Sequence, residues 1–276
     1  MISMDSEAIQ RMLTFEDTLA QYFSSDTLQH KVQLSRNETE IVDFTDSIMS
    51  KEKATRVSAD NVTLTRESTL DAAQKLIHGK TAVLDFASAT MPGGGVLIGS
   101  RGQEEDLCRY TTLYFNLNTD FLRKNYYEKN KKDRHLIKCN TCIYIPEVQI
   151  IKNPENPMAR FSEKQYFPID AIVCAAPNLR KVSEIPTEDE LVVYHEERAK
   201  NIFQCAAKHG VSNLVLGAFG CGAFRNPPEI VAKAYKQVLT EYENLFESIV
   251  FAFNCTSEDD KNFSAFSHAL RNESTR

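Results

Sequence analysis

Residues 81–114 read TAVLDFASATMPGGGVLIGSRGQEEDLCRYTTLY, and this stretch gives the clearest indication of the fold class. Its first part, Thr81–Ala87, is a short apolar run that predicts a buried strand. Three glycines follow at Gly93–Gly95. Gln103 and the two acids Glu104 and Glu105 stand at the start of a predicted helix over Gln103–Leu117. A strand, a glycine loop and a helix in this order are typical of an α/β protein, in which ligands lie beyond the carboxyl ends of strands.

The glycines of the chain gather in two windows. Of 10 glycines, five lie within Gly93–Gly102 and four within Gly210–Gly222. Three glycines of the second window, Gly217, Gly220 and Gly222, belong to the stretch LGAFGCGAFRNPP at Leu216–Pro228, into which a predicted strand over Leu214–Phe219 runs. Bare backbone and its N–H groups let an anion such as a phosphate approach closely. We expect both loops to face one crevice that binds such a ligand.

The remaining pattern alternates amphipathic helices with short apolar strands. Predicted helices are Asp5–Phe23, Leu70–Ile77, Thr187–Gly210, Pro227–Leu245 and Glu258–Leu270. Predicted extended segments are Ile143–Ile145, Val148–Ile151, Ala171–Ala175 and Ile249–Phe253. This alternation predicts an α/β domain with a mixed sheet between helical layers. The first 60 or so residues are polar and less regular, and they are interpreted as an extension packed on that domain.

Composition excludes several classes of protein. The chain has 276 residues, 42% of them hydrophobic and 25% charged, with a net charge of −6, which argues against a strongly basic nucleic-acid-binding surface. No apolar run reaches the length of a membrane span. Seven scattered cysteines predict reduced thiols and a cytoplasmic location, or a nuclear one in a eukaryote. Cys139 and Cys142 form a lone CxxC and the histidines are isolated, so neither a metal nor a cofactor is expected.

The glycine triplet followed after seven residues by QEE, set between DFAS and LCRYTTLY, resembles the signature of microbial-type poly(ADP-ribose) glycohydrolases, which are catalytic members of the macrodomain fold. Further matching segments are NVTLTRESTLDAAQKL, IYIPEVQIIKN, AIVCAAPN, LGAFGCGAFRNPP and IVFAF. The resemblance covers roughly Val62 to Phe253. It implies a macrodomain-like three-layer α/β/α domain with a central mixed sheet over residues 61–276, and a partly helical N-terminal extension over residues 1–60.

The resemblance also implies an activity and roles for individual residues. The expected reaction is hydrolysis of the ribose–ribose O-glycosidic bonds of poly(ADP-ribose), which releases ADP-ribose without a metal. Glu105 is implied as general acid and base, and Glu104 as the group that holds the ribose hydroxyls. The implied substrate-binding residues are Gly93, Gly94, Gly95, Val96, Gln103, Gly220, Cys221, Gly222, Ala223 and Phe224. Expected partners are poly(ADP-ribose), ADP-ribose and ADP-ribosylated proteins, with no membrane and no sequence-specific nucleic acid.

Two positions depart from the family pattern, and two other functions stay open. Microbial relatives commonly have Asn in place of Asp85 and Trp in place of Phe219. One alternative function is a non-catalytic module that binds ADP-ribose, which would keep the glycine loops without needing the carboxylates. The other is a hydrolase of mono-ADP-ribosylated protein or nucleic acid, and the residues alone do not separate polymeric from monomeric substrates.

Overall fold

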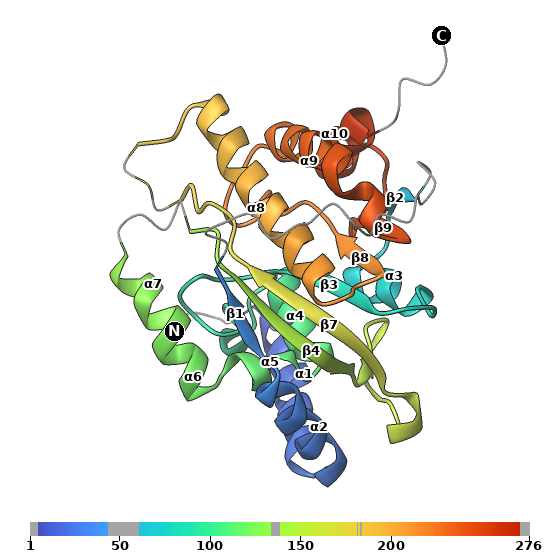
Figure 1. Cartoon of the computed structure of the whole chain (residues 1–276). Coiled ribbons are helices and arrows are strands. Elements are labelled where there is room, and N and C mark those ends of the chain that lie inside the picture. The colour runs from blue at the N-terminus through green and yellow to red at the C-terminus, as the bar shows by residue number, and fades with distance from the viewer. Residues whose placement is uncertain (1–4, 44–60, 134–138, 181, 183, 271–276) are drawn as a thin grey trace. The chain divides into compact units, whose positions relative to one another are not determined.

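A computed structural model of the chain describes residues 5–43, 61–133, 139–180, 182 and 184–270. The strands are β1 (Glu40–Val42), β2 (Val62–Thr65), β3 (Thr81–Phe86), β4 (Cys142–Ile150), β5 (Lys152–Asn153), β6 (Asn156–Arg160), β7 (Phe167–Cys174), β8 (Asn213–Leu216) and β9 (Ser248–Ala252). Seven of them form a mixed sheet in the order β1-β4-β7-β3-β8-β9-β2, and β5 pairs with β6 (Figure 1). The predicted α/β class with a central mixed sheet is confirmed.

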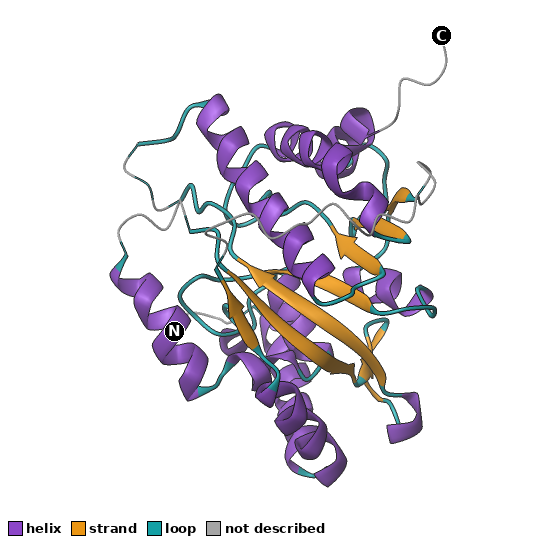
Figure 2. Ribbon diagram, in the orientation of Figure 1, coloured by secondary structure: helices purple, strands orange, loops and turns teal. Residues whose placement is uncertain are grey.

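The helices are drawn in purple in Figure 2. They are α1 (Ser6–Phe23), α2 (Asp26–Asn37), α3 (Thr69–Lys75), η1 (Val96–Ile98), α4 (Gln103–Tyr110), α5 (Leu113–Leu117), α6 (Asp120–Leu122), η2 (Arg123–Tyr127), α7 (Glu128–Lys132), η4 (Glu163–Gln165), α8 (Glu188–Lys208), α9 (Pro228–Tyr242), η5 (Glu243–Leu245) and α10 (Lys261–Leu270). Among the helices of these ranges, none combines the length and the apolarity that a bilayer-crossing segment needs.

The chain divides into two compact units. The first comprises Met1–Ile41, Asp85–Arg134 and Ile143–Val173, and the second comprises Val42–Leu84, His135–Cys142 and Cys174–Arg276. The first unit therefore holds α1, α2, the glycine loop and α4, whereas the second holds α8, α9, α10 and the loop after β8. The division into an extension and a domain at residue 60 stays a prediction.

In the first unit, the N-terminal helices pack their apolar sides onto α5. Tyr22 of α1 stacks on Phe115 with ring centroids 3.7 Å apart, and Leu28 and Val32 of α2 complete this cluster. The helix α1 begins as predicted, because the Asp5 carboxylate accepts the N–H of Glu7. Helix α2 was not predicted. Its buried apolar stripe is only Leu28 and Val32, too thin to stand out as a period.

In the second unit, parallel strands are covered by long helices. Strands β3, β8, β9 and β2 pair in parallel in that order. Helices α8, α9 and α10 lie side by side (Figure 1), and Phe203 of α8 stacks on Tyr242 of α9. The predicted start of α8 is confirmed as a capping box between Thr187 and Glu190.

One predicted helix and two predicted extended segments are corrected. The helix over Gln103–Leu117 is interrupted between α4 and α5, because Thr111 takes an extended conformation and bridges to Ile150. The two extended segments around Pro146 are one strand, β4. The chain passes the proline with Glu147 at a φ of 57°, and the Asp170 carboxylate accepts the N–H of Glu147 at 3.0 Å.

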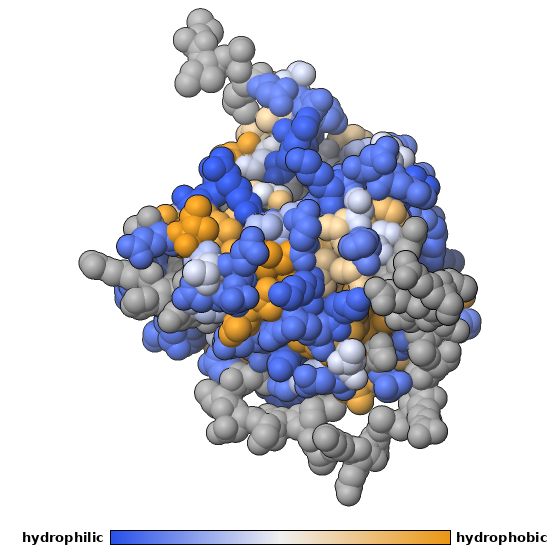
Figure 3. Space-filling model, turned by 90° about the horizontal axis from the view of Figure 1, so that it is seen from above, coloured by the Kyte–Doolittle hydropathy of each residue, from blue (hydrophilic) through white to orange (hydrophobic). Residues whose placement is uncertain are grey.

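The surface in view in Figure 3 is largely hydrophilic, with small apolar areas between polar ones. Scattered apolar residues of this kind are normal on folded proteins. Two of the more exposed ones, Leu97 and Ile98, belong to η1 in the glycine loop.

Candidate functional site

The glycine loop Gly93–Gly102 connects the end of β3 to α4 and brings bare backbone against two carboxylates. Gly94 has a φ of 56°, which L side chains rarely adopt. A Cβ at Gly94 would lie 2.5 Å from Oε1 of Glu105 and 2.9 Å from Oε2 of Glu104. Any side chain at this position would therefore displace both acids.

The first turn of α4 carries three consecutive side chains that accept hydrogen bonds from backbone N–H groups. These bonds are Phe86 N–H to Gln103 Oε1 at 2.9 Å, Ser88 N–H to Glu104 Oε2 at 2.7 Å, and Gly95 N–H to Glu105 Oε1 at 2.9 Å. One helical turn thus holds the end of the strand and the glycine loop together, and it fixes both carboxylates at the loop.

Three consecutive N–H groups of the first loop already have hydrogen-bond partners. Gly94 donates to Met91 O and Val96 donates to Gly93 O, each at 3.1 Å, while Gly95 donates to Glu105. At these three positions the loop offers a close approach to bare backbone, and its N–H donors are bonded to other groups of the protein.

Glu104 is the more deeply enclosed of the two acids. Its side chain is 3% exposed, and Asp85 beside it is fully buried. Burial raises the pKa of Glu104 well above its usual range, and the Asp85 carboxylate raises it further, whereas the Ser88 N–H opposes the shift. Glu104 is therefore held toward its neutral, proton-carrying form.

The groups around Glu104 also keep their protons. Burial raises the pKa of the Cys108 thiol and of the Tyr127 hydroxyl, and the nearby acids, Asp85 among them, raise both further. These two side chains consequently add no negative charge to the cluster. Tyr114 lies against the glycines, since a Cβ at Gly93 would come within 2.9 Å of its ring.

The second loop, which follows β8 in the second unit, is built around a buried asparagine. Asn226 donates from Nδ2 to Pro177 O at 2.7 Å and to Gly220 O at 3.0 Å. Gly220 has a φ of 79°, and a Cβ there would lie 2.5 Å from the Ala176 side chain. In contrast, a Cβ at Gly222 would meet nothing within 4 Å. The loop is thus fixed at Gly220 and open at Gly222.

His195 of α8 supports this loop, and the sequence analysis missed its role. Its Nε2 lies 2.9 Å from Oδ1 of Asn226, and its ring is edge-on to Phe219. Burial lowers the pKa of His195 to about 4, so the ring is neutral near pH 7. His195 is isolated from other histidines in the sequence, and this observation was used only as an argument against a metal site. The residue that could have indicated a support for this loop is Asn226, which stands directly before Pro227 in the quoted motif.

The structure brings one group of predicted site residues together in the first unit and the other in the second. The first group is Gly93, Gly94, Gly95, Val96, Gln103, Glu104 and Glu105. The second group is Gly220, Cys221, Gly222, Ala223 and Phe224. That the two loops face one crevice stays a prediction, as do the roles of these residues. Within the described ranges, no group of three or more His, Cys, Asp or Glu side chains is placed to hold a metal.

The chain is an α/β protein with a mixed seven-stranded sheet, and its glycine loop lies against a pair of carboxylates. Residues 15–153 match the family described as the microbial-type PARG catalytic domain, and the chain belongs to that family. PARG stands for poly(ADP-ribose) glycohydrolase. A comparison with curated proteins found no match.

Solved structures of bacterial poly(ADP-ribose) glycohydrolases share the fold. The chain is similar to the enzyme from Thermomonospora curvata, with 24% identity, a TM-score of 0.81 and coverage of 95% of this chain and 99% of that one. It is also similar to the structure of that enzyme bound to the inhibitor ADP-HPD, with 26% identity, a TM-score of 0.78 and coverage of 94% and 98%. The Deinococcus radiodurans enzyme in complex with ADP-ribose shows 30% identity, a TM-score of 0.71 and coverage of 87% and 96%.

Proposed function

We propose that the protein hydrolyses the ribose–ribose O-glycosidic bonds of poly(ADP-ribose) and releases ADP-ribose. The observation that carries this proposal is the pair of carboxylates on the first turn of α4. Glu105 is held at the backbone of the glycine loop, and Glu104 is buried beside it with a raised pKa. Paired acids in different surroundings suit the cleavage of a glycosidic bond, which needs a proton donor and stabilisation of a positively charged centre.

Glu105 is proposed as the general acid and base. It donates a proton to the departing ribose oxygen as the bond to the anomeric carbon breaks. The resulting carboxylate then takes a proton from the water that attacks the oxocarbenium-like centre. The Gly95 N–H holds Oε1 of Glu105 and leaves its other oxygen for this proton transfer.

Glu104 is proposed to hold the ribose hydroxyls. Its raised pKa keeps a proton on the side chain, so it can both donate to and accept from a hydroxyl. A neutral Glu104 also removes one source of repulsion against a diphosphate.

The diphosphate is proposed to pass along the bare backbone at Gly94 and to contact the second loop at Gly222. The family likeness to the Deinococcus radiodurans enzyme, whose structure holds ADP-ribose, supports this ligand. The open space at Gly222 supports an approach of the ligand to that position.

Turnover of defined substrates tests the function. Purified protein is incubated with poly(ADP-ribose) and, in parallel, with mono-ADP-ribosylated protein and nucleic acid, and free ADP-ribose is measured by chromatography. We expect ADP-ribose from the polymer. Binding of ADP-ribose without release from any substrate would instead identify a binding module. Release of ADP-ribose only from mono-ADP-ribosylated protein or nucleic acid would show that these, and not the polymer, are the substrates.

Glu105→Gln tests the catalytic assignment. The amide keeps the size of the side chain but cannot donate or accept the proton, so kcat on the polymer should fall by about 10³-fold or more. Calorimetry should show ADP-ribose binding retained. Glu197→Gln, the matched control, makes the same chemical change at an exposed position of α8 and should leave kcat within about threefold of wild type. A Glu105→Gln variant that keeps more than a tenth of the wild-type kcat would refute the role of Glu105.

A further inference from the structure

The N-terminal helix α1 contacts the glycine loop directly. Arg11 donates from Nε to the carbonyl oxygen of Gly99 at 2.6 Å, across 88 residues of sequence. Gly99 has a φ of 69°, and a Cβ there would lie 2.3 Å from the Ala8 carbonyl oxygen. The backbone of the loop therefore lies against the backbone of α1, with the Arg11 side chain joining the two.

A short run of backbone contacts links this junction to Glu105. The residue after Gly99 is Ser100, whose N–H donates to Gly95 O at 3.1 Å. A Cβ at Gly95 would lie 2.2 Å from Oγ of Ser100, so the two segments are in close contact. Gly95 in turn donates its N–H to Glu105 at 2.9 Å. A shift of Gly99 would move the hydrogen-bond donor of the Glu105 carboxylate.

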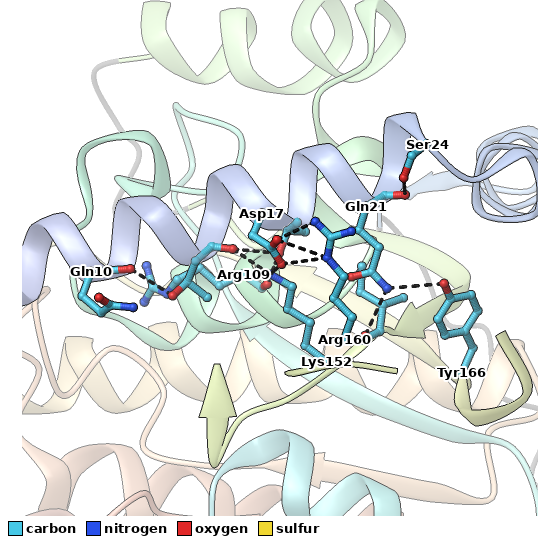
Figure 4. A network of polar contacts seen from close by, with 11 residues as sticks. Gln10, Asp17, Gln21, Ser24, Arg109, Lys152, Arg160 and Tyr166 are labelled. Carbon is cyan, nitrogen blue, oxygen red and sulfur yellow. Dashed lines mark hydrogen bonds and ion pairs between the residues drawn. The ribbon is translucent and has the colours of Figure 1, made fainter. Parts of the chain in front are cut away.

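The helix that carries Arg11 is itself anchored at its other end. Asp17 lies between Lys152 and Arg160 (Figure 4), with ion-pair distances of 2.7 Å and 2.5 Å. Lys152 is completely buried and also donates to Thr14 O at 2.8 Å. In addition, the Thr18 hydroxyl donates to the carbonyl oxygen of Arg109 on α4. These contacts fix the position of α1, and they therefore also fix the position of Arg11 relative to Gly99.

We propose that Arg11 is a positioning residue that holds the glycine loop through Gly99 and thereby places Glu105 for proton transfer. This inference rests on the proposed function of Glu105. Small displacements of a catalytic group cost rate more than they cost binding, and a misplacement of about 1 Å lowers rates by up to about 10²-fold. The effect of losing Arg11 should therefore fall on kcat.

The experiment compares Arg11→Ala with Arg36→Ala in the full chain. Arg36 is the matched control because it also joins an N-terminal helix to a carbonyl, but one of α5 and not of the glycine loop. It donates to Phe115 O from Nε at 3.1 Å and from Nη2 at 2.7 Å. We expect Arg11→Ala to lower kcat on poly(ADP-ribose) by about 10-fold to 100-fold, with KM within about threefold. Arg36→Ala should keep kcat within about twofold. Arg11→Lys, which keeps a long cationic donor, should recover part of the lost kcat.

Hydrogen exchange of the loop amides provides a readout that does not depend on turnover. Exchange at residues 95–100 should be faster in Arg11→Ala and unchanged in Arg36→Ala, while both variants show similar Tm. Equal losses of kcat in the two alanine variants, or unchanged loop exchange in Arg11→Ala, would overturn the inference. A wild-type protein that releases no ADP-ribose would refute the proposed function, and the exchange measurement would still decide whether Arg11 holds the loop.

Discussion

Glu104 and Glu105 are neighbours in sequence but have different surroundings. Glu104 is buried beside Asp85, and the combined effect of burial and charge raises its pKa. Glu105 is half-buried and accepts the N–H of Gly95 at the loop. Successive residues on a helix point in directions about 100° apart, so a single turn can place one acid inside the protein and the next at its edge. This separation is the physical basis of the two roles proposed for them.

Glu104→Gln should stabilise the protein, and the gain should increase with pH. The raised pKa means that the folded chain holds a proton that the unfolded chain releases above about pH 4.5. Stability is therefore lost as pH rises from 4.5 toward the raised pKa, by up to about 1.4 kcal/mol per pH unit. Glutamine does not titrate, yet it still accepts the Ser88 N–H. Thermal unfolding at pH 5 and pH 8 measures the difference in Tm, and an equal difference at both values would contradict the assigned shift.

At the scale of elements, the second loop combines a rigid base with an open tip. Asn226 ties Gly220 to Pro177, and neutral His195 holds the other end of the Asn226 amide. Because each of these groups is buried, losing one would leave the others without partners at a cost of about 1–3 kcal/mol. The tip at Gly222 is exposed and has free space around it.

Gly222→Val should separate ligand binding from folding. Nothing in the protein lies within 4 Å of a Cβ at Gly222, so Tm should change little. ADP-ribose measured by calorimetry should bind at least about 10-fold more weakly, which is 1.4 kcal/mol, because the side chain occupies the space proposed for the diphosphate. Gly220→Ala is the contrasting variant. It should lower Tm because of its positive φ and its contact with Ala176. Wild-type affinity in Gly222→Val would remove Gly222 from the proposed binding surface.

Elements formed by interactions between residues close in sequence could be predicted, whereas contacts between residues distant in sequence could not. Strand β3, the cap of α8 and the acids of α4 were predicted from local patterns, because apolar runs and capping residues act within a few positions. The break at Thr111 was not predicted, since it depends on a bridge to Ile150. Asn226 was quoted in a motif, but its contact with His195 arises from packing of α8.

At the scale of the whole chain, segments distant in sequence meet at Asp17. It forms ion pairs with Lys152, at the start of β5, and with Arg160, at the end of β6. The hydrogen bond from Arg160 lowers the pKa of Asp17 most, and the hydrogen bond and charge of Lys152 lower it further. Burial lowers the pKa of Lys152. The first helix is therefore joined by charge to a hairpin made much later in the chain.

Asp17→Asn should destabilise the protein markedly. The change leaves the completely buried Lys152 without its counter-charge, a loss that typically costs about 3–5 kcal/mol. Glu7→Gln is the control, because Glu7 pairs with Arg101 at the surface, where an ion pair contributes about 0–1 kcal/mol. Urea unfolding measures both. Similar free energies of unfolding for the two variants would show that Lys152 does not depend on Asp17.

The bond between Thr14 and Lys152 spans 138 residues and has a consequence for the timing of folding during synthesis. Chains grow at about 5–20 residues per second, so Thr14 is made roughly 7 to 28 seconds before Lys152. During that interval the Thr14 carbonyl oxygen and the Asp17 carboxylate lack the Lys152 side chain that contacts both in the finished protein. Helix α1 thus waits for residues made much later in the chain before all its contacts can form, and the glycine loop that Arg11 contacts is made within that interval.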